Sequence, residues 1–265
     1  MVALALCASL GGLAPSVGAQ LAVDRVDLTL VPRSATERAG TITVTNTSDR
    51  PVAATVYTAD WDRDLDGANR FYELGTLPRS CGSVLRVFPR TISLPPSSAQ
   101  TLQVIVDGAD AFVATCWAIV FIETRLPPPP GESRQLSYVL RTGVKAYVVP
   151  PGLSADGVVE DMRLHAGHAE ATVAAPQPPA SRRLEVVFRN AGAIPLVTRG
   201  RVEIRRPDNT VAATIPVEEF PTLPGVRRRL ILDVPVLAPG RYVALALLDF
   251  GGAEIVAGQL EFEAP

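Results

Sequence analysis

The sequence predicts an all-β protein built from β-sandwiches. With 265 residues, the chain is long enough for two domains of ordinary size. Valine, threonine, proline and glycine are plentiful, aromatic residues are few, and no long stretch repeats its apolar residues with the period of a helix. Short alternating segments separated by turn residues are typical of sandwiches.

The N-terminal residues 1–19 are expected to be a signal peptide. An apolar run from Val2 to Ala14 precedes the small residues Val17, Gly18 and Ala19, which gives the spacing of a cleavage site before Gln20. No other stretch is long enough to cross a membrane. We therefore expect export to a periplasm, with the cell surface or secretion as the alternative location.

The next segments predict the opening of an immunoglobulin-like sheet. Leu21–Val31 reads as a first strand, and a turn at 47–50 joins the strands Gly40–Asn46 and Pro51–Asp60 into a hairpin. Further strands are expected at Val84–Phe88, Thr91–Leu94, Gln100–Val106 and Cys116–Thr124. The last of these is the most apolar and is expected at the centre of a sheet.

The longest predicted strand is Gln135–Pro151. Leu136, Tyr138 and Leu140 lie on one face of the strand. Beyond Gly143 the pattern is less regular: Val144, Ala146 and Val148 share one face, and Lys145 and Tyr147 lie on the other. Lys145 is the only lysine of the chain. It suits a single carboxylate in a tight cleft, or it is an ordinary solvated side chain.

Prolines end this strand and mark the expected domain boundary, which gives a first domain at 20–152 and a second at 153–265. The second is also predicted to be an immunoglobulin-like sandwich, since a turn before Tyr242 leads into a strand as in such domains. Its strands are expected at Val158–Leu164, Ala169–Val173, Arg183–Asn190, Leu196–Arg205, Thr210–Ile215, Arg227–Val234, Arg241–Phe250 and Glu254–Phe262.

Two cysteines remain after the signal peptide, Cys81 and Cys116. An even pair in an exported chain predicts one disulfide, with two buried free thiols as the alternative.

An acidic segment matches the spacing of a calcium-binding loop, with Asp62, Asp64 and Asp66 followed by Gly67 and Glu73. Strands rather than helices flank it. An acidic hairpin turn built on Asp66-Gly67 is therefore the favoured interpretation, and calcium, the one cofactor considered, is the alternative.

Four pieces of the first domain, taken in order, resemble the N-terminal domain of PapD-like periplasmic pilus-assembly chaperones. They are LAVDRVDLTL with the TITVTNTSDRPVAATVY hairpin, FPRTISLPP, FIETRLPP and QLSYVLRTGVKAYVVPP. The second domain resembles that family only in being immunoglobulin-like. The resemblance implies that the last piece is lent as an edge strand to a pilin subunit that lacks one of its own.

The resemblance also implies roles for individual residues. Leu136, Tyr138 and Leu140 would enter the subunit, and Lys145 would hold the subunit's terminal carboxylate. The family pairs its lysine with an arginine of the first strand, but that position here is Asp27. Arg25, two residues away, is the candidate substitute.

The sequence argues against other functions. It contains no nucleophile elbow, no HExxH metal motif and no phosphate-binding glycine loop, so we expect no enzyme. A net charge of −2 offers no basic surface for nucleic acid. Two hypotheses remain. One is a chaperone that binds a pilin-like or other envelope subunit, and the other is a structural or adhesive envelope protein with the same fold.

Overall fold

The computed structural model describes residues 21–33, 36–108, 113–126, 138–165 and 182–265, and within them the chain is almost entirely β-strand. The predicted signal peptide, Leu136 and the expected strand Ala169–Val173 lie outside the described residues. Two separate pairs of sheets form two sandwiches, which confirms the predicted fold class.

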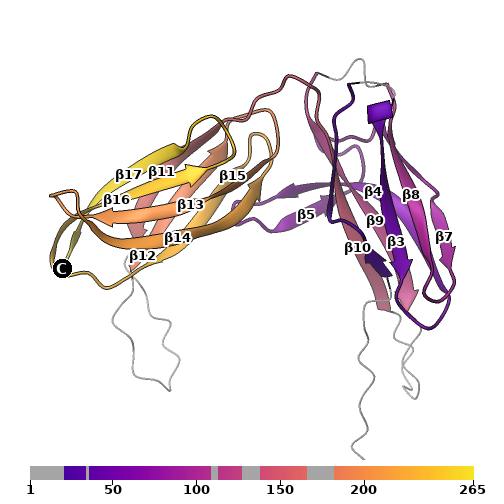
Figure 1. The fold of residues 1–265 in the computed structure, drawn as a ribbon, viewed down its shortest axis with the longest axis horizontal. Coiled ribbons are helices and arrows are strands. Elements are labelled where there is room, and N and C mark those ends of the chain that lie inside the picture. Colours follow the sequence, from indigo (N-terminus) through magenta and orange to yellow (C-terminus); the bar gives the residue numbers. More distant parts are fainter. Residues whose placement is uncertain (1–20, 34–35, 109–112, 127–137, 166–181) are drawn as a thin grey trace, which may run out of the picture.

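The first sandwich faces a four-stranded sheet against a six-stranded one (Figure 1). The four-stranded sheet has the order β1 (Leu21–Val23), β3 (Ala39–Asn46), β8 (Ala99–Val106), β6 (Leu85–Phe88). The larger sheet has the order β2 (Asp27–Leu30), β10 (Tyr138–Val148), β9 (Cys116–Leu126), β4 (Val52–Arg63), β5 (Asn69–Tyr72), with β7 (Thr91–Leu94) also paired to β4. A short 3-10 turn, η1 (Thr36–Arg38), precedes β3.

The second sandwich is built from a three-stranded and a four-stranded sheet. The three-stranded sheet has the order β11 (Gly157–His165), β12 (Arg182–Asn190), β15 (Arg227–Val234). The four-stranded sheet has the order β14 (Val211–Thr222), β13 (Leu196–Arg205), β16 (Gly240–Asp249), β17 (Val256–Ala264). Among the described residues no ladder joins β1–β10 to β11–β17. This separation agrees with a domain boundary at residue 152, which stays a prediction.

Side chains on the two faces of the six-stranded sheet have different surroundings, because successive residues of a strand point to opposite faces. On β10, Val144, Ala146 and Val148 are buried in the core between the two sheets. The other face carries a second cluster that includes Trp61, Trp117, Ile119, Phe121 and Tyr147. This second face looks toward the second sandwich, and we call it the cleft face.

The expectation of one continuous first strand is wrong. Residues Leu21–Val23 pair with β3 in one sheet, and Asp27–Leu30 pair in parallel with β10 in the other. Asp24 marks the change of sheet, since its Oδ1 accepts the amide N–H of Thr43 at 2.8 Å. The bend that follows lets the chain cross between the sheets.

The acidic segment forms the predicted hairpin, between the ends of β4 and β5. Asp64 Oδ1 accepts the amide N–H groups of Asp66 and Ala68 at 3.1 and 2.9 Å, and Gly67 has a φ of +87°. A side-chain acceptor at the start and a glycine with positive φ are the two requirements of such a turn. The hairpin reaches from the first sandwich toward the second (Figure 1).

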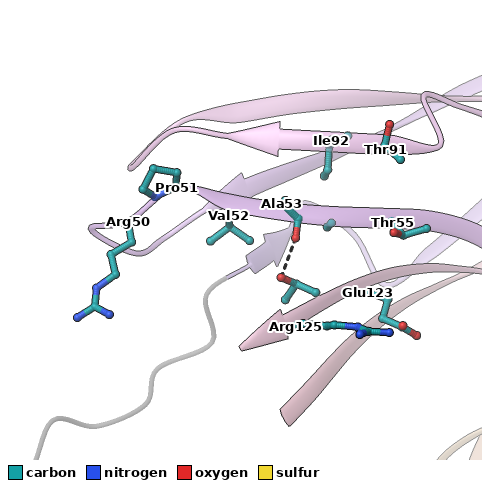
Figure 2. A pocket seen from close by; sticks show the side chains of 11 residues that line it. Arg50, Pro51, Val52, Ala53, Thr55, Thr91, Ile92, Glu123 and Arg125 are labelled. Carbon is teal, nitrogen blue, oxygen red and sulfur yellow. Dashed lines mark hydrogen bonds between the residues drawn. The ribbon is translucent and has the colours of Figure 1, made fainter. Parts of the chain in front are cut away.

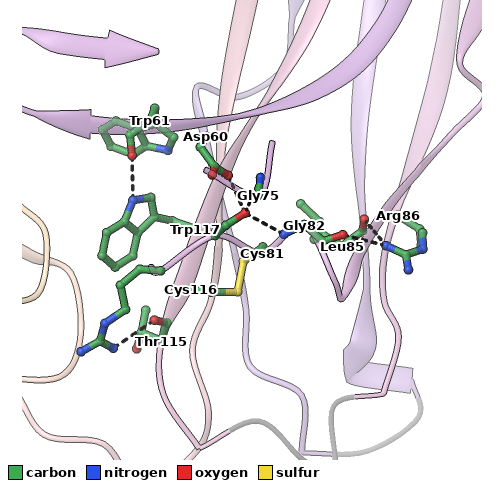
Figure 3. Close-up of a disulfide and its surroundings, with 12 residues drawn as sticks. Asp60, Trp61, Gly75, Cys81, Gly82, Leu85, Arg86, Thr115, Cys116 and Trp117 are labelled. Atoms are coloured by element: carbon green, nitrogen blue, oxygen red, sulfur yellow. Dashed lines mark hydrogen bonds between the residues drawn. A yellow bond between two sulfur atoms is a disulfide. The ribbon is translucent and has the colours of Figure 1, made fainter. Parts of the chain in front are cut away.

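Cys81 and Cys116 form the predicted disulfide, which joins the loop before β6 to the start of β9 (Figure 3). Both residues are buried, and the backbone around them is also paired, since Trp117 N–H donates to the carbonyl of Arg79 at 3.0 Å. The bond therefore fastens a long loop to the central strand of the sheet.

Replacing both cysteines by serine is expected to lower the free energy of unfolding by about 3–4 kcal/mol. The bond closes a loop across a sequence separation of 35, and a loop of that size restricts the unfolded chain by about this amount. Urea denaturation measures the change, and the wild-type protein in a reducing agent should lose the same amount. An unchanged unfolding midpoint in both samples would contradict the estimate.

Candidate binding strand and interdomain cleft

Strand β10 is covered on its outer edge over only part of its length. Its inner edge pairs antiparallel with β9 along the whole of Tyr138–Val148, without a shift of register. On the outer edge β2 pairs only with Lys145–Val148. Within the described part of the chain, no backbone covers the outer edge of Tyr138–Val144.

The direction of the backbone groups on this open edge follows from the parallel ladder. Lys145 N–H donates to the carbonyl of Val26 at 3.0 Å, and Val149 N–H donates to that of Leu30 at 2.9 Å. Because every second residue of a strand points its N–H and C=O to the same edge, the groups of Val139, Arg141 and Gly143 also point outward. The structure thus presents a strand edge about seven residues long that pairs with none of the residues it describes.

Two of the three side chains predicted to enter a partner lie on this open segment. Tyr138 is 49% exposed and Leu140 is half-buried, and both extend the core-facing row beyond the part that the sandwich covers. Such exposed apolar side chains beside a free edge are costly in a protein that has no partner for them.

Lys145 lies on the cleft face, where the open edge ends. Its Nζ is 5.1 Å from the ring centroid of Trp61, in cation–π geometry. The side chain is half-buried, and its ammonium makes no hydrogen bond or salt bridge with any residue that the structure describes. A half-buried cation that has no hydrogen-bond acceptor among the described residues is suited to an anionic ligand.

Burial lowers the pKa of Lys145 from its usual value, and the nearby charge of Arg63 lowers it further, while Asp27 acts in the opposite direction. Asp27 is the β2 residue in register with Lys145. It lies on the cleft face, since its neighbours Leu28 and Leu30 point into the core. An incoming carboxylate therefore meets one negative charge as well as the lysine.

Replacing Asp27 by asparagine is expected to lower the pKa of Lys145 still further, because the substitution removes the negative charge that favours the ammonium form. As Lys145 is the only lysine of the chain, NMR of protein labelled selectively at lysine follows its titration as a single signal. An unchanged or higher pKa would show that Asp27 does not act on Lys145.

Arg25, the candidate substitute for the missing arginine, pairs with the neighbouring acid Asp24. It lies in the bend between β1 and β2, and its Nη2 is 2.9 Å from Asp24 Oδ2. The cation that acts on Lys145 is instead Arg63, at the end of β4. Sequence reasoning missed Arg63, although the alternation of Tyr57, Ala59 and Trp61 along β4 places it on the same face.

Several contacts tie the two sandwiches together beside this site. Leu223 of the second sandwich is buried in the aromatic cluster of the cleft face. Thr115 Oγ1 donates to the carbonyl of Ala193 at 2.6 Å. At the acidic hairpin, the backbone N–H of Arg229 donates to the carbonyl of Leu65 at 2.7 Å. The guanidinium of Arg229 donates two hydrogen bonds to the carboxylate of Asp66, at 2.8 and 2.7 Å. These contacts hold the second sandwich against the cleft face.

The four residues considered for calcium have separate surroundings. Asp64 caps its own turn and pairs with Arg70, Asp66 pairs with Arg229, and Tyr72 donates to Asp62. Among the described residues, which include Glu73, no group of three or more His, Cys, Asp or Glu is placed to hold a metal ion. The hairpin acts here as a contact between the sandwiches.

A surface hollow of about 500 Å³ lies elsewhere, where β9 separates from β4 (Figure 2). Arg50–Thr55, Thr91, Ile92 and Glu123–Arg125 line it, and Thr124 Oγ1 donates to the carbonyl of Ala53 at 2.8 Å across the gap. It contains none of the predicted site residues, so the cleft face and the β10 edge remain the candidate site.

Comparison with solved structures supports the fold of two sandwiches. No family model and no curated protein matches the sequence. A solved chain from the chaperone–tip adhesin complex of CFA/I fimbriae biogenesis is 11% identical with a TM-score of 0.51, over 93% of this chain and 99% of that one. The class 5 fimbriae chaperone CfaA is 11% identical (TM-score 0.49, 92% and 99% covered), and the Pseudomonas aeruginosa CupB2 chaperone is 17% identical (0.41, 91% and 98%).

The resemblance to PapD-like chaperones that the sequence indicated is therefore confirmed at the level of the fold. It extends over both sandwiches, whereas the sequence pieces lie in the first alone. No helix among the described residues is long and apolar enough to cross a membrane.

Proposed function

We propose that the protein is a periplasmic chaperone that binds a pilin-like or other envelope subunit by lending it the free edge of β10. The observation that carries the proposal is the pairing of β10. Its inner edge pairs with β9 throughout, whereas β2 pairs with its outer edge only from Lys145 onward. An open edge of this length offers backbone groups for a continuous ladder, and the exposed side chains beside it supply specificity.

Two further features support the proposal. The fold is that of a protein from a chaperone–adhesin complex. In addition, the unpartnered Lys145 lies at the covered end of the same strand, where the end of a bound chain would meet it. Neither feature favours an enzyme. Among the described residues no group of three or more acidic side chains is placed to hold a metal ion, so the adhesive alternative keeps Asp27 on the cleft face as its one supporting observation.

The test replaces Tyr138 by a photo-crosslinking phenylalanine derivative in cells of the source organism. Crosslinked products from the periplasmic fraction are identified by mass spectrometry. The same derivative at Val211, which is exposed on β14 of the second sandwich, is the control. We expect one envelope subunit to be linked at Tyr138 and not at the control position.

The crosslink should disappear when Leu140 is replaced by aspartate, which puts a charge into the row of side chains that enters the partner. Persistence of the same product in that variant, or an identical product from the control position, would overturn strand lending.

A further inference from the structure

The four-stranded sheet of the second sandwich has an outer face that none of the contacts with the first sandwich described above uses. Strand β16 lies between β13 and β17 in this sheet (Figure 1). Its core-facing residues alternate with Val243, Leu245 and Leu247, which point outward and are half-buried. We call these three side chains the outer strip. An outward sheet face is normally polar, so an aliphatic row in its middle indicates a contact surface.

The strands on the two sides of the outer strip carry opposite charges. The charged residues of the outward row of β13 are three arginines and one acid, namely Arg199, Arg201, Glu203 and Arg205. The outward row of β17 ends with Glu261 and Glu263, and these form no salt bridge with the described residues. One side of the strip is therefore positive and the other side is negative.

The positive side is held in place by the acid in its row. The side chain of Glu203 is only 9% exposed, and its carboxylate accepts from Nε of Arg201 at 2.7 Å and from Nε of Arg205 at 3.0 Å. Arg205 also donates from Nη1 to Oδ1 of Asn209 at 2.8 Å. One carboxylate balances only one of these two guanidinium groups, so a positive charge remains at a defined place beside the strip.

Two exposed aliphatic side chains lie on the same two flanking strands. Val197 is in the outward row at the start of β13 and is 56% exposed, and Ile255 directly precedes β17 and is 59% exposed. A single exposed aliphatic residue needs no explanation, but here each one extends a surface whose centre is already apolar.

We propose that this outer face binds a second copy of the chain, with a two-fold axis parallel to β16. Rotation about that axis exchanges the two flanks, so that β13 of each copy lies over β17 of the other. Arg205 and Glu261 are both in register with Val243, so each Arg205 meets Glu261 of the second copy. The outer strip then packs on itself. An axis across the strands would instead bring β13 over β13, with arginine facing arginine.

The size of the face predicts a weak dimer. Three strands of about nine residues cover about 15 Å by 30 Å, or about 900 Å² for both copies together, which is the range of reversible contacts. Arg241 and Asp249 end the outward row of β16. Because packed sheets cross at about 30°, the two rows diverge at their ends, and these like charges stay in solvent.

Sedimentation equilibrium of the purified protein measures the association. We expect a concentration-dependent equilibrium between monomer and dimer. Leu245→Arg should raise the dissociation constant at least about a hundredfold, because two arginines would meet on the axis. Glu261→Lys should raise it about tenfold at low salt and less at high salt. The matched control is Ile231→Arg, at an exposed outward position of β15 in the other sheet, and it should leave the constant unchanged. A wild type that stays monomeric up to millimolar concentration would overturn the proposal.

Crosslinking between introduced cysteines tests the direction of the axis. Both cysteines of the described chain are joined in a disulfide, so the new cysteine supplies the reactive thiol. Leu247→Cys lies beside the axis and should link to its counterpart through a short bismaleimide. Thr214→Cys, exposed on β14 two strands away, should not, since about 20 Å separates the two copies of that position. Linkage of Thr214→Cys without Leu247→Cys would contradict the proposed axis.

Self-association through the open edge of β10 is the competing result. Leu140→Asp changes that edge and should leave the dimer intact, so loss of the dimer in this variant and not in Leu245→Arg would overturn the proposal. The outcome is separate from strand lending. Leu245→Arg should keep the crosslink from Tyr138 to the envelope subunit, and absence of that crosslink in a protein that still dimerises would refute the proposed function alone.

Discussion

Replacing Val139 by proline is expected to lower the affinity for the captured subunit by about tenfold to a hundredfold while the protein stays folded. The N–H of Val139 points to the open edge, so proline removes no hydrogen bond of the β9 ladder. In the complex, a carbonyl of the partner would be left without its donor and would face the proline ring. An unsatisfied buried acceptor costs about 1–3 kcal/mol, which corresponds to this range.

The measurement is surface-based binding of the subunit identified by crosslinking, with thermal melting as the check on folding. Val139→Ala is the matched control, since it removes the same side chain and keeps the N–H. Thr142→Pro is the opposite case. Its N–H points toward β9, so this substitution should destabilise the free protein. Equal affinities of Val139→Pro and Val139→Ala would show that the backbone of this edge is not used.

Replacing Lys145 by methionine is expected to abolish carboxylate binding without lowering the stability of the free protein. The ammonium has no hydrogen bond or salt bridge with the residues that the structure describes, and its desolvation opposes folding. Methionine removes the charge, and its thioether packs against Trp61 in place of the cation–π contact. Affinity for the subunit should fall by about tenfold or more, as for a lost charge-assisted hydrogen bond.

The pH dependence of stability gives an independent check on the same residue. The folded-state pKa of Lys145 is below its usual 10.5, so in the window between the two values the unfolded chain binds more protons than the folded one. The free energy of unfolding of the wild type therefore gains a rising contribution through that alkaline window, and the methionine variant lacks it. A variant that is less stable at pH 7 and keeps the same alkaline slope would contradict the account.

Sequence reasoning predicted the parts of the fold that depend on local pattern. The period-two alternation located nearly every strand, and the Asp66-Gly67 turn and the cysteine pair were also identified correctly. The first strand was wrong because the alternation of Leu21–Val31 is continuous. The sheet changes at Asp24, whose contact with Thr43 is not visible in the local sequence.

The site was harder to predict, because it depends on which strands lie beside each other. Lys145 was singled out by its rarity, but its neighbours Trp61 and Arg63 are distant in the chain and come close only through the order β10, β9, β4. Gly143 illustrates the same limit. The strand runs straight through it, and an added Cβ would lie 2.7 Å from Cδ1 of Ile119, so this glycine provides space and does not bend the chain.

Hydrogen exchange at single amides of β10 tests the central claim most directly. In the free protein, the outward N–H groups of Val139, Arg141 and Gly143 should exchange fast, while those of Leu140, Thr142 and Val144, which point toward β9, should be protected. Addition of the captured subunit should slow the first three and leave the others protected. Protection of all six in the free protein, or no change at the outward amides in the complex, would contradict the lending of this edge.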